Sequence, residues 1–282
     1  MLKSTRREFL KVSGLSAAGA SMATVLGNCT TVPKTKIDGY QRLNLAMASY
    51  SFREFGLEET IAMTKRLGLT RIAFKSFHLP MESSVDEIKR VADLVNASNL
   101  DLYGCGVVYM SNEAEVHRAF NYARAAGMRV IIGVPEHNLL ELVNKKVVEY
   151  DIKLAIHNHG PGDERYPSPE SAYEKVKDLD PRMGLCIDIG HAKRIGLDPT
   201  EAAEKYADRL HDVHIKDVSS ATAEGSTVEI GRGVIDIPRF LRTLLEINYT
   251  GMVSFEFEKD GKDPLAGVAE SLGYVRGVLS VI

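Results

Sequence analysis

Short apolar runs alternate with longer segments of helical period from Leu43 to the end of the chain. The runs are rich in Val, Ile, Leu and Ala, which is typical of buried strands. The segments between them repeat apolar positions every three to four residues and carry charged faces, which predicts helices. Strands are predicted to begin at eight positions: Leu43, Arg71, Asp101, Arg129, Lys153, Met183, Leu210 and Met252. Regular alternation of strand and helix predicts a parallel sheet, and eight such units predict an α/β fold, a closed (β/α)8 TIM barrel.

Residues at the ends of the predicted helices support this interpretation. The apolar period from Leu57 to Leu67 stops at Gly68, a residue typical of helix C-termini. Asn112 and Asp198 precede later helices, where their side chains can act as N-caps. The interval before the last strand is longer, because residues 218–236 form a glycine-containing insertion. Loops that follow barrel strands build the active-site face, so we expect this insertion to lie over the site.

Residues 1–29 differ from the rest of the chain. Arg6 and Arg7 precede a weakly apolar run that ends near Leu26. This pattern resembles a twin-arginine export signal, with an amphipathic surface helix as the alternative. Cys29 lies where a lipoprotein signal would be cleaved and acylated. Because the run is shorter than the roughly 20 residues of a membrane-spanning helix, we predict a periplasmic protein or a membrane-anchored lipoprotein, without a transmembrane span.

The predicted organisation is an export signal over residues 1–29, a linker over 30–42 and a single barrel domain over 43–282. The whole chain contains 35 basic and 38 acidic residues. Removal of the signal leaves 31 basic and 37 acidic residues, a net charge of −6. Nucleic-acid phosphates require concentrated Lys and Arg, so an acidic chain weighs against a nucleic-acid partner. The oligomeric state is left open by the sequence.

Polar residues stand at the carboxyl ends of the last four predicted strands. They are His157, Asp188, His214 and Glu256, one from each strand. Closing the barrel would bring these ends around one axis, so the four side chains are expected to converge. Imidazole nitrogens and carboxylate oxygens suit a divalent ion such as Mn, Co, Zn or Mg. The pattern therefore predicts a metal site, with a structural polar cluster, including a helix cap at Asp188, as the alternative.

Three motifs carry a family resemblance: the segments 188–191, 214–217 and 231–236, the last followed by Glu256. They resemble the xylose isomerase-like superfamily of sugar epimerases, isomerases and inosose dehydratases. The resemblance extends from about Leu43 to the end of the chain. It implies that Asp188, His214 and Glu256 are metal ligands. It also implies a substrate-binding role for His191 and Arg232, and we place Asp217 beside them as a substrate-binding candidate.

Two positions depart from the family pattern. Epimerases of the family carry glutamate at the ends of strands two and five, where this chain has Lys75 and His157. This difference weighs against a proton shuttle between two glutamates. The sequence His157-Asn158-His159 is closer to the histidine-rich strand of inosose dehydratase-like members. A lyase is therefore an alternative to an isomerase.

Four side chains are candidates for proton transfer. Glu256 or His159 is a candidate base, and Lys75 or Lys216 could donate a proton or stabilise negative charge. Either lysine could instead be held in a salt bridge. Asp217 adjoins Lys216, but neighbours on a strand point to opposite faces, so the two are not expected to pair directly.

The motifs together predict a metal-dependent isomerase or epimerase that enolises a keto sugar, with a small carbohydrate as substrate. The alternatives are a lyase or dehydratase acting on a keto sugar or 3-keto-glycoside, and a non-catalytic carbohydrate-binding barrel. An endonuclease of the same superfamily is disfavoured by the acidic charge and by the export signal.

Overall fold

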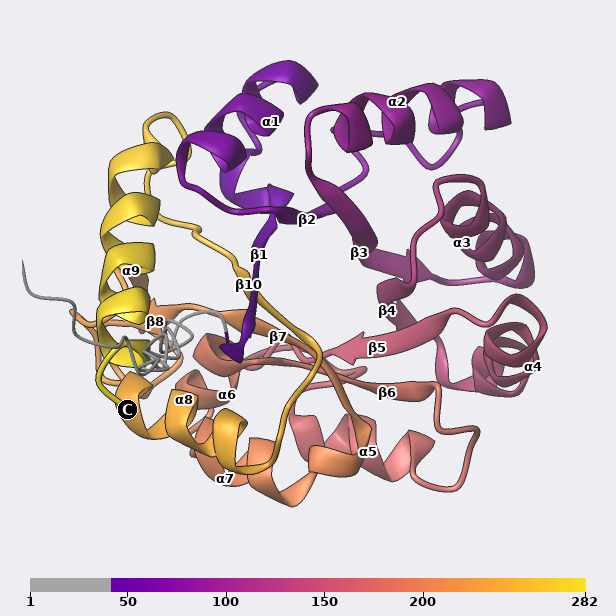
Figure 1. Ribbon diagram of the computed structural model, residues 1–282. Helices are drawn as coiled ribbons and strands as arrows, with labels where there is room; N and C mark the ends of the chain where they lie inside the picture. The colour runs from indigo at the N-terminus through magenta and orange to yellow at the C-terminus, as the bar shows by residue number, and fades with distance from the viewer. Residues whose placement is uncertain (1–41) are drawn as a thin grey trace, which may run out of the picture. The chain divides into compact units, whose positions relative to one another are not determined.

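The computed structural model describes residues 42–282, and eight of their strands close into a parallel barrel (Figure 1). Each strand pairs with its neighbour in chain order, and the last barrel strand pairs with the first. The barrel strands are β1 (Asn44–Ala48), β2 (Arg71–Phe74), β3 (Asp101–Met110), β4 (Val130–Pro135), β5 (Lys153–His157), β6 (Met183–Asp188), β7 (Leu210–Ile215) and β10 (Met252–Phe255). The predicted (β/α)8 barrel is confirmed, and every predicted strand start lies within one residue of the observed one.

Helices surround the barrel in Figure 1. They are α1 (Leu57–Arg66), α2 (Val85–Ala97), α3 (Glu113–Ala125), α4 (Leu140–Tyr150), α5 (Pro169–Val176), α6 (Ile189–Arg194), α7 (Pro199–Lys205), α8 (Ile237–Glu246) and α9 (Pro264–Leu279). The sequence did not predict the short helix α6 or the two-stranded hairpin of β8 (Asp217–Val218) and β9 (Thr227–Val228). Both elements follow strands at the carboxyl end of the barrel.

The helix ends predicted from the sequence form the contacts and backbone conformations that their residue types favour. The side chains of Asn112 and Asp198 accept backbone N–H groups of the first turns of α3 and α7. Gly68 has a φ of 70°, the left-handed conformation that lets the chain leave α1 without a Cβ clash. These predicted helix ends are therefore confirmed.

A compact set of side chains fills the inside of the barrel. Strands β1 to β6 each contribute at least one of them, as expected when alternate residues of a strand face the axis. The set consists of Ala46, Ala73, Tyr103, Val130, Ile132, Ala155 and Cys186. Most members are small, and Tyr103 fills the remaining space while its hydroxyl bonds to Ser254 on β10. The filled interior leaves the carboxyl end of the barrel as the place for a polar site.

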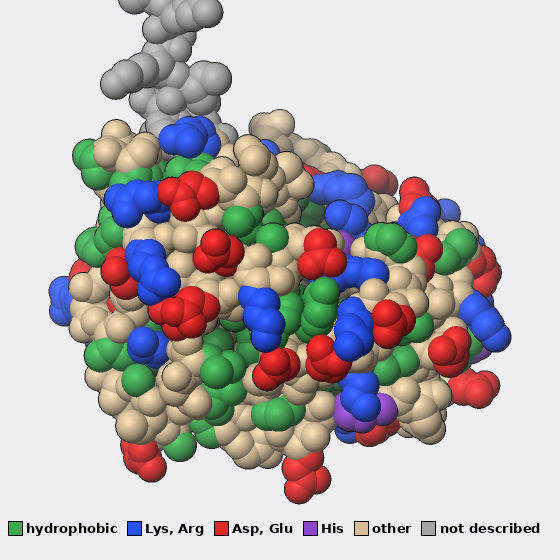
Figure 2. Space-filling view, turned by 90° about the horizontal axis from the view of Figure 1, so that it is seen from below, with side chains coloured by type: hydrophobic (Ala, Val, Ile, Leu, Met, Phe, Trp, Pro, Cys, Tyr) green, Lys and Arg blue, Asp and Glu red, His purple; other side chains and the backbone are tan. Residues whose placement is uncertain are grey.

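The surface carries charges of both signs. Figure 2 shows basic and acidic side chains interspersed over the face displayed, without a broad basic area on it. Among residues 42–282, no helix is long and apolar enough to cross a membrane. The predicted export signal, Cys29 and nearly all of the predicted linker lie outside the described residues.

Candidate functional site

Four buried side chains converge at the carboxyl end of the barrel. His157 ends β5, Asp188 ends β6, His214 lies in β7 and Glu256 follows β10, and each offers a ligand atom within 4.8 Å of the others. His157 Nε2 lies 3.1 Å from His214 Nδ1 and 3.3 Å from Asp188 Oδ2. His214 Nδ1 lies 3.1 Å from Glu256 Oε2. Tetrahedral ligands at about 2.1 Å from an ion are about 3.4 Å apart, so these spacings suit a divalent metal.

The protonation of His157 and Asp188 suits a metal. Burial lowers the pKa of His157 to about 3, so its imidazole is neutral, the form that binds metals. Burial alone would raise the pKa of Asp188, but the neighbouring His191 and Lys216 outweigh it and keep that carboxyl ionised. Burial opposes protonation of His214, but Glu256 outweighs it and raises the pKa of His214, so this imidazole must lose a proton to bind an ion. The ring nitrogens that face the cluster are His157 Nε2 and His214 Nδ1, and the carboxylate oxygens that face it are Asp188 Oδ2 and Glu256 Oε2. This set of two nitrogens and two oxygens fits a divalent ion at this place.

Asp188 is fixed by its own backbone and by α6. Its Oδ1 accepts the backbone N–H of His191, which caps α6, while its Oδ2 faces the cluster. Its backbone N–H donates to Asn158 Oδ1, and the Asn158 side-chain amide donates to the Asp188 carbonyl. One oxygen of the Asp188 carboxylate therefore caps α6, and the other faces the cluster. The same turn brings the His191 ring to the site, with Nε2 at 3.9 Å from Asp188 Oδ2.

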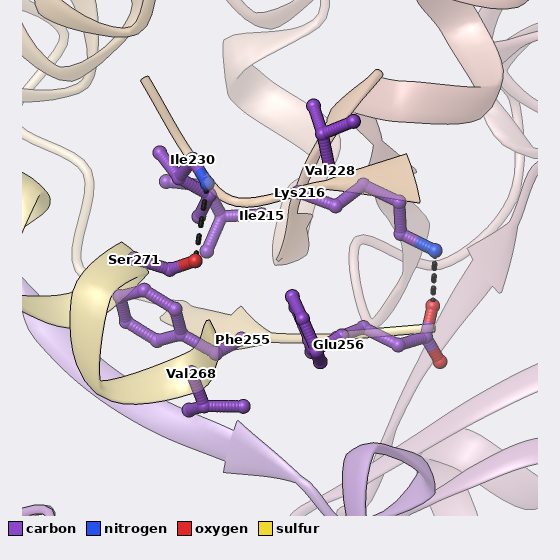
Figure 3. Close-up of a pocket in the computed structure, with 9 residues that line it drawn as sticks. Ile215, Lys216, Val228, Ile230, Phe255, Glu256, Val268 and Ser271 are labelled. Carbon is purple, nitrogen blue, oxygen red and sulfur yellow. Dashed lines mark hydrogen bonds and ion pairs between the residues drawn. The ribbon is translucent and has the colours of Figure 1, made fainter. Parts of the chain in front are cut away.

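Lys216 is buried among three carboxylates. Its Nζ lies 2.8 Å from Asp188 Oδ2, 2.7 Å from Glu256 Oε2 and 2.8 Å from Glu258 Oε1. Figure 3 shows the amine turned toward Glu256, beside an apolar cavity of only about 10 Å³. Burial opposes protonation, but the carboxylates Asp188 and Glu256 outweigh it and raise the pKa of Lys216. This geometry matches the salt-bridged alternative rather than a lysine that gives up its proton.

His159 and Lys75 lie at the rim of the cluster. The His159 ring centroid is 4.5 Å from that of His157, and its side chain is 25% exposed. Its Nδ1 lies 3.2 Å from Asp163 Oδ2, and its Nε2 lies 3.1 Å from the Tyr109 hydroxyl. Lys75 donates from Nζ to the Val107 carbonyl at 2.7 Å, and burial lowers its pKa. The imidazole with its carboxylate partner is therefore the partly exposed acid–base group beside the four ligands.

Asp217 does not occupy the predicted substrate-binding position. Its side chain is buried and accepts backbone N–H groups of Val218, Gly231, Gly233 and Ile235 at 2.9 to 3.2 Å. As predicted, it points away from Lys216, and it thereby folds the insertion of residues 218–236 onto the end of β7. Asp217 stands at this position because the backbone N–H groups of the loop need a buried acceptor.

Arg232 is also placed away from the cluster. Its guanidinium pairs with Glu270 on α9, with Nη2 at 2.8 Å from Oε2, and its side chain is 62% exposed. In the structure this guanidinium is engaged by Glu270, and its contact with substrate stays a prediction. A lone arginine in a glycine-rich segment carries no information about which side of the loop it will occupy.

Sequence reasoning assigned no role to several residues that the structure brings to the site. They are Tyr109, Asn158, Asp163 and Glu258. Asp163 follows His159 by four residues across a turn containing two glycines, which was a usable signal for a side-chain pair. Glu258 follows Glu256 by two residues, so period-two geometry could have placed both on one side of the chain.

Comparison with known proteins agrees with this geometry. The sequence profile of the family described as "Xylose isomerase-like TIM barrel" matches residues 36–278. The chain belongs to this family. An inosose dehydratase of Geobacillus kaustophilus is 34% identical over 91 residues, which cover 27% of this chain and 30% of that protein. The match thus spans less than a third of that relative, whose activity does not transfer to this chain by itself.

Two solved structures share the fold. An uncharacterised protein from Parabacteroides distasonis has 24% identity and a TM-score of 0.67, and the match covers 84% of this chain and 99% of that one. The apo form of a 3-keto-D-glucoside 4-epimerase from E. coli has 15% identity and a TM-score of 0.67, with coverage of 83% and 99%. At these identities the likeness establishes the barrel alone.

Proposed function

We propose that this protein is a divalent-metal-dependent enzyme that enolises a keto sugar and reprotonates it, as an isomerase or epimerase. The observation that carries the proposal is the convergence of His157, Asp188, His214 and Glu256 within 4.8 Å. Members of the family act on sugars by isomerisation, epimerisation and dehydration, and all three reactions are consistent with proton removal next to a carbonyl. A bound divalent ion would supply the Lewis acidity that draws electron density from a substrate carbonyl and the adjacent hydroxyl.

Glu256 is the proposed base. Burial would raise its pKa, but His214 and Lys216 outweigh that effect and hold the pKa well below its ordinary value. The carboxylate is therefore ionised and can accept the carbon-bound proton. Lys216, fixed by Glu258 on its other side, holds this carboxylate in place.

His159 is the proposed partner that exchanges the second proton. Asp163 lies against Nδ1, which favours a tautomer with the proton on that nitrogen and orients the ring. Its partial exposure allows the proton to return to solvent between turnovers. We assign to His191, whose ring lies beside Asp188, the role of holding a substrate hydroxyl.

A second candidate is a lyase that expels a group next to the enolised carbon. Two observations favour it. The position of the family's strand-five glutamate is taken by His157, whose low pKa keeps it from carrying a proton at neutral pH. An inosose dehydratase is among the sequence relatives. In this reaction the imidazole of His159, protonated on both nitrogens by uptake of a proton from solvent, would give its Nε2 proton to the leaving group.

Proton exchange in deuterated water tests both candidates. The full chain is loaded with Mn²⁺ and incubated with keto sugars and 3-keto-glycosides, and products are followed by NMR. Deuterium next to the carbonyl with a rearranged sugar supports the isomerase or epimerase. An unsaturated sugar or a released aglycone identifies the lyase. Stoichiometric metal without exchange or elimination across the panel overturns the proposal in favour of a binding protein.

Glu256→Gln tests the placement of the site. The substitution removes a negative ligand and the proposed base, so we expect metal affinity to fall at least tenfold and exchange to be lost. Glu87→Gln is the matched control, because Glu87 is exposed on the outer helix α2, where its carboxylate pairs with Arg90. Metal content by mass spectrometry and exchange by NMR report the two effects separately. Normal values of both in Glu256→Gln would refute the site.

A further inference from the structure

A second hollow opens beside the metal cluster. It has a volume of about 550 Å³ and lies between the ends of β3 and β4 and the loop that follows β5. We call it the outer pocket, and its lining residues are Tyr109, Val134, Glu136, His137, Gly162, Asp163, Glu164 and Arg165. Its volume is within the range of about 300–1,000 Å³ that small-molecule sites occupy. None of the four proposed metal ligands lines it.

The side chain of His159 joins the outer pocket to the cluster. His159 contacts the pocket residues Tyr109 and Asp163 through its two ring nitrogens, at 3.1 and 3.2 Å. On its other side the His159 ring is 4.5 Å from the ring of the proposed ligand His157. A molecule bound across both places would therefore have the bond between its two parts next to His159.

The lining has the chemistry of a carbohydrate site. Tyr109 is 52% exposed. Its ring stacks with His159, and Arg165 and Lys75 lie 5.9 and 6.0 Å from its centroid, so the apolar face of a sugar ring can pack against the part that stays exposed. Arg165 donates to the Val134 carbonyl and pairs with Glu136, so the wall of the pocket is fixed before a ligand arrives. The carboxylates of Glu136, Asp163 and Glu164 supply acceptors for hydroxyl groups.

The charge of the lining selects against anions. Glu136, Asp163 and Glu164 face one cation, Arg165, which is already paired. A phosphate or carboxylate placed here would meet net negative charge. A neutral, hydroxyl-rich group meets no such penalty.

We propose that the outer pocket binds the second sugar unit of a keto-glycoside whose oxidised ring lies at the metal cluster. This inference rests on the proposed function and specifies its substrate class. It predicts that a keto-disaccharide is a better substrate than the keto-monosaccharide, because the second ring gains contacts that the single ring lacks. It also places His159 beside the glycosidic oxygen.

The test compares a 3-keto-glucoside of glucose with 3-keto-glucose in the Mn²⁺-loaded full chain. We expect the wild type to prefer the disaccharide in kcat/KM, and Tyr109→Ala and Glu136→Gln each to reduce that preference at least fivefold, mainly through KM. Glu136 does not contact His159 in this structure, so its variant separates ring binding from any change at the imidazole. The matched control is Arg118→Ala, which removes an exposed ion pair with Glu82 elsewhere on the surface and should keep the wild-type preference.

A binding measurement makes the inference independent of turnover. Saturation-transfer NMR with the unoxidised disaccharide should show contacts from both rings in the wild type, and weaker contacts from the second ring in Tyr109→Ala. Equal kcat/KM for the two substrates, or a preference that both variants retain, overturns the outer-pocket assignment while leaving enolisation intact. Absence of exchange with every keto sugar overturns the proposed function, and second-ring contacts in the NMR experiment would still support the pocket.

Discussion

Replacement of Asp217 by alanine should unfold the insertion that closes the barrel end. The buried carboxylate accepts four backbone N–H groups, and two of the donors, Val218 and Ile235, belong to buried residues. Each buried N–H left without a partner costs about 1–3 kcal/mol. Exposed Gly231 can bond to water instead. Two buried donors therefore give an expected loss of about 2–6 kcal/mol, or roughly 4–24 °C in Tm for a domain of this size.

Asp217→Asn refines the experiment because it keeps the shape of the side chain. Its amide oxygen can still accept N–H groups, but its NH₂ group would face backbone donors such as Gly231 and Gly233. We expect an intermediate loss of stability. Asp93→Ala is the control, since Asp93 is exposed within α2, and its change should stay within about 0.5 kcal/mol.

The assays are urea unfolding followed by circular dichroism, and limited proteolysis read by mass spectrometry. We expect new cleavage within residues 218–236 in Asp217→Ala, at protease concentrations that leave the wild type intact. A variant with wild-type stability and an uncut loop, but weaker substrate binding, would refute the structural role. It would return Asp217 to the substrate-binding position that its motif first suggested.

Two further predictions concern buried cations and imidazoles. Lys216→Met removes the cation beside the carboxylates of Asp188 and Glu256, so the free energy of unfolding of the metal-free protein should fall by about 3–5 kcal/mol. Mn²⁺ should restore much of this loss. Equal losses of Tm in EDTA and in Mn²⁺ would contradict the prediction. Burial, reinforced by Lys153, lowers the pKa of His211 to about 4. The unfolded chain therefore takes up this proton first, near pH 6.5, and stability falls as pH drops from 6.5 to 4, by about 3 kcal/mol in total. His211→Asn should lose less stability than the wild type between pH 7 and 4.5 in urea titrations, and parallel curves would disprove the assignment.

The local sequence pattern was enough to predict the barrel and the convergence of four side chains at its carboxyl end. The strands are apolar runs whose boundaries depend on near neighbours, so Arg71, Asp101 and Lys153 begin strands where the pattern placed them. Parallel strands that close on themselves must bring their carboxyl ends together. Four residues at those ends, His157, Asp188, His214 and Glu256, could therefore be grouped without coordinates, although their spacing could not.

The tertiary structure decided which partners each polar group takes. Lys216 bonds to Glu256 and Glu258 in the segment after β10, 40 and 42 residues away, whereas its neighbour Asp217 accepts backbone N–H groups of the following loop. The outer pocket exists because Tyr109 and Arg165 meet across separate βα units. Sequence determines which groups stand at the end of each strand, because strand period is local. Pairing among those groups depends on distances fixed only when the barrel closes and its loops pack.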